Sequence, residues 1–261
     1  ITGVSLFDLE RVLDPTDDMN KQLIVAPPSF SVSYIGFNTN WPPFDDPKFR
    51  QALNHAVDKD LIAKEVLSEL VEPAYGVLPP GFPGFNANLT GLRFDAERAK
   101  QLLSESKYTG DIPRIELTVP GTGGTIGLDL EVVLEMWRST LGVEVEIVQV
   151  EWATYLQDLQ ENKFQAFAGL GWEADYPDPQ DFLDILFHTD SEINHGAYSN
   201  PEADRILELA RVETDINKRV ELYRQAEDMI VEDGAWVPLW FTGDRYVLVK
   251  PHVKGYHVPP M

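Results

Sequence analysis

The segment from Arg114 to Val150 constrains the fold more than any other part of the chain. Apolar residues alternate over its first strand, recur at helical spacing in its middle and form a second strand-like run at its end: Ile115, Leu117 and Val119; Leu130, Val133, Trp137 and Leu141; residues 143–150. This order predicts a βαβ unit with a parallel strand pair and a right-handed crossover. The chain is therefore expected to be an α/β protein.

Weaker patterns extend this unit to a mixed, partly parallel sheet flanked by helices. Further strands are predicted at Leu23–Ala26, Ser31–Phe37, 164–170, 236–241 and 245–249. Further helices are predicted at residues 4–13 and 95–106, around Tyr155, and directly after Asp46, Asp178, Asn200 and Asp215. One more helix is predicted to begin near Lys59, and its inward-facing residues would be Leu61, Ile62, Val66 and Leu70. The proline- and glycine-rich segment 75–89 is expected to drape over the surface as a long loop.

The segment Gly171-Trp-Glu-Ala-Asp175-Tyr-Pro-Asp-Pro179 is the strongest candidate for a ligand site. It joins a predicted strand to a helix that begins with Asp178 as N-cap and Pro179 as first residue. Such turns carry ligand groups in many α/β proteins. This one offers the indole of Trp172, the carboxylate of Asp175 and the phenol of Tyr176. The alternative is an ordinary proline-rich turn with its aromatic residues packed inward.

Composition limits the possible partners. The formal net charge of −22 opposes binding to nucleic acid or to an anionic membrane, because both would repel this surface. It allows a cationic ligand, although acidity can also serve solubility alone. No run of 18 apolar residues occurs in the sequence, so no direct membrane insertion is expected. Cysteine is absent, which excludes disulfides and thiolate metal sites and fits an exported bacterial protein.

No motif in the sequence predicts a cofactor, a metal or a catalytic residue. Residues 121–127 are glycine-rich and lie between a strand and a helix, but their spacing matches neither a dinucleotide-binding loop nor a P-loop. The five histidines form no pair at metal-ligand spacing. The acids Asp175, Asp178, Asp181 and Asp184 lack the glycine and glutamate of an EF-hand, and most of them are interpreted as acids of a helix first turn.

Several collinear segments resemble the extracellular solute-binding proteins of family 5, the receptors of oligopeptide, dipeptide and nickel ABC transporters. The similar segments run from Val25 to Tyr256: Tyr34 to Thr39, Pro42 to Asp46, Arg50 to Leu53, Ala56 to Ile62, Gly171 to Pro179, Tyr198 to Pro201, Asp204, Arg211 to Asp215, Arg219, Tyr223, Trp236 to Leu239, and Val249 to Tyr256. Members of this family are about twice as long and close two lobes on a ligand.

The resemblance implies a periplasmic-binding-protein-like lobe. Residues 1–261 would form the second, C-terminal lobe, with segments near 25–45 and 165–261 close to the hinge and the N-terminal lobe absent. It implies a non-enzymatic protein that captures peptides or similar solutes and delivers them to ABC permease subunits. The full-length protein would be periplasmic or extracellular and membrane-anchored, as a lipoprotein.

The resemblance also implies site residues. The position of Asp175 holds the α-ammonium of the peptide in the family's peptide receptors, Trp172 and Tyr176 would wall the cleft, and Asn38 and Asn194 are weaker candidates. Residues 139–204 contain one cation, Lys163, so a ligand carboxylate would be bound by the other lobe or by backbone amides. Ligand identity stays open, because family members also carry nickel complexes and sugars.

Two other functions are compatible with the sequence. A carboxylate-dependent hydrolase acting on a glycan or peptide would use two of the 43 acidic residues, but nothing selects the pair. A self-standing interaction domain would use the acidic surface. Turnover of a substrate would separate the hydrolase from the binding protein, and a genome neighbourhood with permease and ATPase genes would favour the binding protein over the interaction domain.

Overall fold

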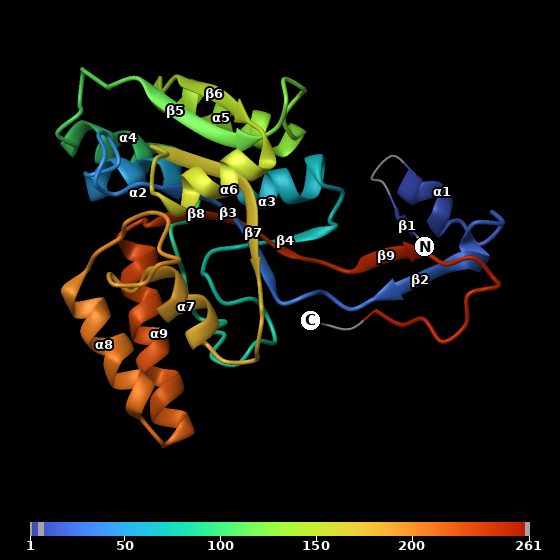
Figure 1. The fold of residues 1–261 in the computed structure, drawn as a ribbon. Helices are drawn as coiled ribbons and strands as arrows, with labels where there is room; N and C mark the ends of the chain where they lie inside the picture. The colour runs from blue at the N-terminus through green and yellow to red at the C-terminus, as the bar shows by residue number, and fades with distance from the viewer. Residues whose placement is uncertain (1, 5–7, 259–261) are drawn as a thin grey trace.

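The main body is built on a six-stranded mixed sheet in the computed structural model, which describes residues 2–4 and 8–258 (Figure 1). In spatial order its strands are β4 (Val71–Pro73), β8 (Trp236–Thr242), β3 (Ser31–Phe37), β7 (Ala166–Glu173), β5 (Ile115–Pro120) and β6 (Val145–Val150). Strand β5 is parallel to β6 and β7, whereas β3 is antiparallel to β7 and β8. The predicted mixed α/β sheet and its βαβ unit are confirmed.

Helices cover both faces of this sheet, because its central strands bury side chains on both sides. One core cluster includes residues of α2 (Pro47–His55), α4 (Ala96–Glu105) and α5 (Leu128–Leu141), and the other includes residues of α6 (Trp152–Gln160), α7 (Gln180–Phe187), α8 (Pro201–Val212) and α9 (Ile216–Glu232). Neighbours along β3 alternate between the clusters: Tyr34 lies in the second and Ile35 in the first. This is the two-residue period expected of a strand.

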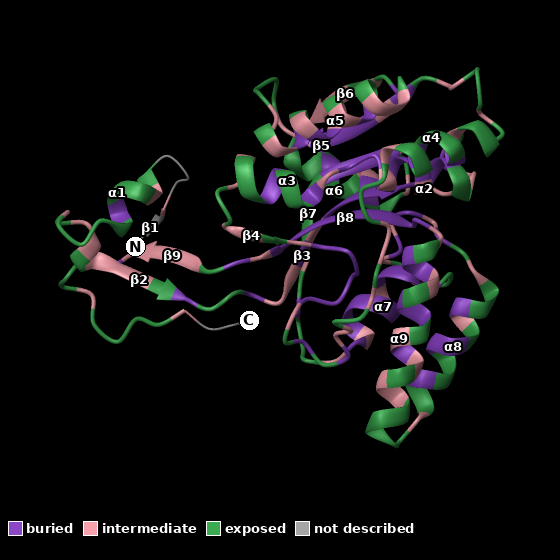
Figure 2. Ribbon diagram, turned by 180° about the vertical axis from the view of Figure 1, so that it is seen from behind, coloured by how far each residue is buried: buried purple, intermediate pink, exposed green. Residues whose placement is uncertain are grey.

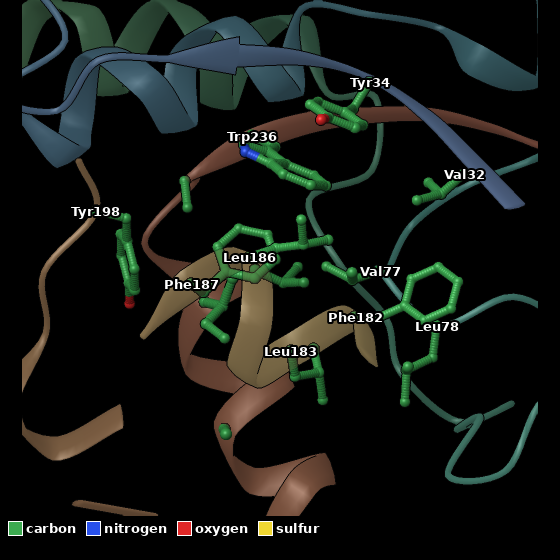
Figure 3. Close-up of a cluster of buried hydrophobic side chains, with 14 of the residues drawn as sticks. Val32, Tyr34, Val77, Leu78, Phe182, Leu183, Leu186, Phe187, Tyr198 and Trp236 are labelled. Carbon is green, nitrogen blue, oxygen red and sulfur yellow. The ribbon is translucent and has the colours of Figure 1, made fainter. Parts of the chain in front are cut away.

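Helix α7 connects the candidate turn to the aromatic core (Figure 3). Its residues Phe182, Leu183, Leu186 and Phe187 are all buried. Phe187 packs against Trp236, with ring centroids 4.5 Å apart, and the Trp236 ring stacks on Tyr34. Because this face of α7 is locked into the core, the residues just before the helix are carried on a rigid support.

A second, smaller sheet projects to one side of the main body (Figure 1). It pairs β9 (Arg245–Leu248) antiparallel with β1 (Thr2–Gly3) and β2 (Leu23–Ala26), next to the short helices α1 (Leu9–Leu13) and η2 (Asn20–Gln22). Figures 1 and 2 show that β2 and β9 lead into β3 and β8 of the main sheet. Val25 in this sheet is 51% exposed.

The helix predicted over residues 4–13 is wrong at Val4 and confirmed over Leu9–Leu13. Residues 5–7 lie outside the described part of the chain, and Val4 donates its backbone N–H to the carbonyl of Tyr246 at 3.1 Å, as a continuation of β1. The helix begins at Leu9. Pairing with a strand more than 200 positions away therefore overrides the local helical pattern of Val4, and this contact leaves no trace in the nearby sequence.

The surface loop predicted over residues 75–89 is also wrong in part. Val77, Leu78 and Phe82 are buried, and Figure 3 shows Val77 and Leu78 beside α7. Side chains of α9 bind the backbone of this segment. Glu227 Oε1 accepts the N–H groups of Val77 and Leu78 at 2.8 and 2.9 Å, and Arg224 donates to two carbonyls further along. These partners satisfy backbone groups that would otherwise require water.

Two further helix boundaries differ from the prediction. The helix predicted from Lys59 continues only as α3 (Lys59–Leu61) and the π-helical turn η3 (Ile62–Val66), and Leu61 is 48% exposed rather than inward. Helix α7 begins at Gln180, one residue later than predicted, although Asp178 still accepts the N–H of Gln180 at 2.9 Å. Both differences are local and leave the order of elements unchanged.

Gly36 marks a close contact between β3 and β7. A Cβ atom added there would lie 2.1 Å from the ring of Phe167, the residue paired with Gly36. We expect Gly36→Ala to lower the free energy of unfolding by about 1–3 kcal/mol, the usual effect of overpacking a core. Urea denaturation measures this change. Gly124→Ala is the control, since a Cβ there meets no atom within 4 Å. Equal stability of both variants would contradict the prediction.

Candidate functional site

The turn between β7 and α7 presents several polar and aromatic groups at the surface. Strand β7 is buried over its first three residues and emerges into solvent from Gly169 onward. The next residue after the strand, Ala174, donates its N–H to the carbonyl of Phe30 at 2.8 Å, which ties the turn to the segment before β3. Asp175 and Tyr176 follow and are exposed. The sequence therefore folds here as a rigid strand end followed by an open turn.

The carboxylate of Asp175 has no hydrogen bond or ion pair with any residue in the described ranges. Two arginines from α8 and α9 pair with other acids of this segment. Arg219 forms a two-bond pair with Asp178, and Arg211 forms one with Asp184 at 2.6 Å. The negative charge of Asp175 is therefore uncompensated within the described chain. Such a group can accept an ammonium or another cation.

Trp172 and Tyr176 flank Asp175 in sequence, and both keep part of their surface exposed. The Trp172 side chain is half-buried, and its indole N–H points to Asp181 Oδ2 with the two heavy atoms 3.4 Å apart. Tyr176 is 36% exposed, and its hydroxyl lies 3.4 Å from Gln180 Oε1. Partial burial raises the pKa of Tyr176, so its hydroxyl stays a neutral donor at physiological pH.

Asn38 and Asn194 occupy different positions from this turn. Both are buried, and every polar atom of their side chains binds backbone. Asn38 donates to the carbonyl of Asn162 at 3.0 Å and accepts from the N–H of Asn40. Asn194 donates to two carbonyls and accepts from the N–H of Tyr198. In this conformation both amides hold loops in place, and neither is brought together with Asp175.

An open hollow of about 360 Å³ borders the exposed end of β7. Its wall combines residues of β3, β7, β8 and the start of α5: Ser33, Tyr34, Gly127, Asp129, Leu130, Ala168, Gly169, Leu170, Gly171, Leu239 and Trp240. Asp129 was not among the residues selected from the sequence. Its position right after the glycine-rich segment 121–127 was the available signal.

Two of the four acids in this segment have tertiary contacts that the sequence did not indicate, although Asp181 does lie in the first turn of α7. Asp181 is fully buried and Asp184 is 4% exposed. Asp184 pairs with Arg211 across to α8, and Asp181 accepts the backbone N–H of Asp175 at 2.9 Å. Their partners lie outside the helix that carries them, so helix position alone did not reveal these roles.

Metal-binding and membrane-spanning features are lacking in the described ranges 2–4 and 8–258. These residues contain no group of three or more histidine, aspartate or glutamate side chains placed to hold a metal ion. None of the helices there combines the length and apolar character needed to cross a membrane.

Comparisons with known proteins give a consistent result. Residues 4–194 match the family model described as bacterial extracellular solute-binding proteins, family 5 Middle. The chain is 30% identical to the oligopeptide-binding protein OppA of Bacillus subtilis, over 98% of the chain and 48% of the relative. It is 32% identical to heme-binding protein A of Haemophilus influenzae, over 88% of the chain and 42% of the relative.

A solved structure of similar fold is that of the Escherichia coli murein tripeptide binding protein MppA. The TM-score is 0.83 at 27% identity, over 97% of this chain and 50% of that chain. The chain thus spans about half the length of the proteins it matches.

Proposed function

The chain belongs to the bacterial extracellular solute-binding proteins of family 5, and from this we propose that it forms one lobe of the substrate-binding component of an ABC importer. The protein would capture peptides or similar small solutes between this lobe and a second, N-terminal lobe. It would then deliver them to permease subunits at the membrane. The half-length match to relatives supports the two-lobe arrangement. Segments near 25–45 and 165–261 would lie next to the hinge.

The observation that carries this proposal is the uncompensated carboxylate of Asp175 beside the aromatic side chains of Trp172 and Tyr176. A peptide α-ammonium carries one positive charge and three N–H donors, which a free carboxylate complements. The two rings would cover the adjacent apolar part of the ligand.

The acidic composition of the lobe limits how it can bind the other end of a peptide. The single cation of residues 139–204, Lys163, is bound to Asp158 at 2.8 Å and to Glu161 at 2.6 Å. A ligand carboxylate therefore finds no free basic side chain in this segment. We assign that contact to the second lobe or to backbone amides.

The family consists of solute-binding proteins, and the relatives include both an oligopeptide-binding and a heme-binding protein. Peptides are favoured here because the free group at the turn is an acid. We further propose that the full-length protein is extracellular or periplasmic, is held at the membrane by an anchor and turns over no substrate. No contact among the described residues favours the hydrolase alternative.

Two peptides that differ only at the amino group test this function. Titration calorimetry of the full-length protein with trialanine and with N-acetyl-trialanine should show clear preference for the free amine. Native mass spectrometry of the purified protein identifies any co-purified solute, and chromatography after incubation shows whether the peptide is cleaved. Equal affinity for both peptides would contradict ammonium recognition, and cleavage would favour the hydrolase.

A further inference from the structure

A single buried carboxylate lies beneath the candidate turn. Asp181, in the first turn of α7, has no exposed surface. Its Oδ2 atom accepts the backbone N–H of Asp175 at 2.9 Å and the indole N–H of Trp172 at 3.4 Å. One oxygen thus links the backbone of the proposed ammonium-binding residue to the side chain of the proposed aromatic wall.

The burial of the Asp181 carboxylate, taken alone, lowers the stability of the folded state. The other oxygen of Asp181, Oδ1, is buried and has no hydrogen-bond partner among the described residues. Burial raises the pKa of Asp181, although the two hydrogen bonds oppose that shift. A fully buried carboxylate with one oxygen lacking a partner costs free energy that an apolar side chain of similar size would not.

The other two acids near the turn do not share this role. Asp178 and Asp184 each form a two-bond pair with an arginine, which fixes the start of α7 to α9 and α8. Neither side chain contacts Trp172, and neither bonds the backbone of Asp175. Asp181 is therefore the acid whose hydrogen bonds reach both site residues.

We propose that Asp181 is a positioning residue of the ligand site. It holds the Asp175 backbone and the Trp172 indole in the orientation that leaves the Asp175 carboxylate free for the ligand. This role rests on the proposed function. It also explains why a carboxylate occupies a fully buried position, because an apolar side chain would leave two N–H donors at the turn without an acceptor.

Two substitutions separate positioning from mere packing. The leucine of Asp181→Leu is close to aspartate in shape but accepts no hydrogen bond. In Asp181→Asn, the amide oxygen can still accept both N–H groups. In the full-length protein we expect Asp181→Leu to weaken trialanine binding by about tenfold and to reduce the preference over N-acetyl-trialanine. Asp181→Asn should stay within about threefold of the wild type.

Glu227→Leu is the matched control. Glu227 is also a buried carboxylate that accepts two N–H groups, but these belong to Val77 and Leu78. Glu227→Leu should lower the melting temperature without changing trialanine affinity by more than about threefold. If both Leu variants weaken binding equally, the effect is general destabilisation and the positioning role is overturned.

An NMR measurement without ligand tests the positioning role of Asp181 separately from the proposed function. The indole N–H resonance of Trp172 is assigned by its loss in Trp172→Phe. Its chemical shift should change in Asp181→Leu and return close to the wild-type value in Asp181→Asn. An unchanged resonance in Asp181→Leu would overturn the positioning role. Failure of the wild type to bind trialanine, together with a shifted resonance in Asp181→Leu, would contradict the proposed function and support Asp181 as the residue that holds the turn.

Discussion

Replacing Asp175 by Asn is expected to weaken binding of trialanine to the full-length protein by about 10- to 100-fold. A hydrogen bond to a charged group contributes roughly 1.5–3 kcal/mol, and each 1.4 kcal/mol is about a factor of ten in affinity. Asn keeps the size of the side chain and one acceptor oxygen but removes the charge. Because the carboxylate has no partner among the described residues, its loss should leave the fold intact.

Glu173→Gln provides the control for this substitution. Glu173 is exposed, lies two positions away at the end of β7 and carries the same charge. If the ligand senses only the acidic surface, both substitutions weaken binding alike, and the effect declines with salt. If Asp175 contacts the α-ammonium, only Asp175→Asn removes the preference over N-acetyl-trialanine. Unchanged affinity in Asp175→Asn would remove this residue from the site.

The same comparison in the 261-residue chain by itself tests the two-lobe proposal. An ion pair that stays in water contributes roughly 1 kcal/mol or less, and ligand sites gain affinity by burying most of the ligand surface. The lone chain should therefore bind trialanine weakly, with little effect of Asp175→Asn. Micromolar or tighter binding by the lone chain would contradict the need for a second lobe.

Glu227→Gln is expected to stabilise the protein more at pH 8 than at pH 5. Burial raises the pKa of Glu227 from 4.5 to about 7, against the two backbone hydrogen bonds that lower it. The folded state therefore holds a proton that the unfolded state has already released. The stability that protonated Glu227 contributes is fully present below pH 4.5 and is lost as pH rises through about 7.

The size of this pH-dependent stabilisation follows from the shift in the pKa of Glu227. A change from 4.5 to about 7 corresponds to about 3 kcal/mol in full, of which about 2 kcal/mol falls between pH 5 and pH 8. The glutamine side chain of the variant does not ionise, and its amide oxygen can still accept the N–H groups of Val77 and Leu78. Urea denaturation of both proteins at the two pH values gives the difference directly.

Glu221→Gln, on the exposed side of α9, is the control. If the stability difference between Glu227→Gln and the wild type does not change with pH, the raised pKa of Glu227 is contradicted.

The sequence by itself determined the place of the candidate turn and most of the order of elements, although the short strands β1 and β4 were not predicted. Strands Leu23–Ala26 and Ser31–Phe37 were predicted with the bounds that the structure has. The helix starts at Asp46, Asn200 and Asp215 were predicted from their capping side chains, which do accept N–H groups of the first turn. These features depend on period and capping, which act within a few residues. The exposed acid at position 175 follows from the same kind of local signal.

The tertiary structure alone decided which polar residues support the site and which remain free. Asp175 and Asp181 are both acids of one short segment, yet Asp175 is exposed and Asp181 is buried beneath it. Asp178 is paired because Arg219 approaches from α9, 41 positions along the chain. Segment 75–89 is partly buried because Glu227, again from α9, accepts its N–H groups. A buried charge or backbone group needs a partner, and for Asp178 and segment 75–89 that partner comes from α9, an element distant in sequence.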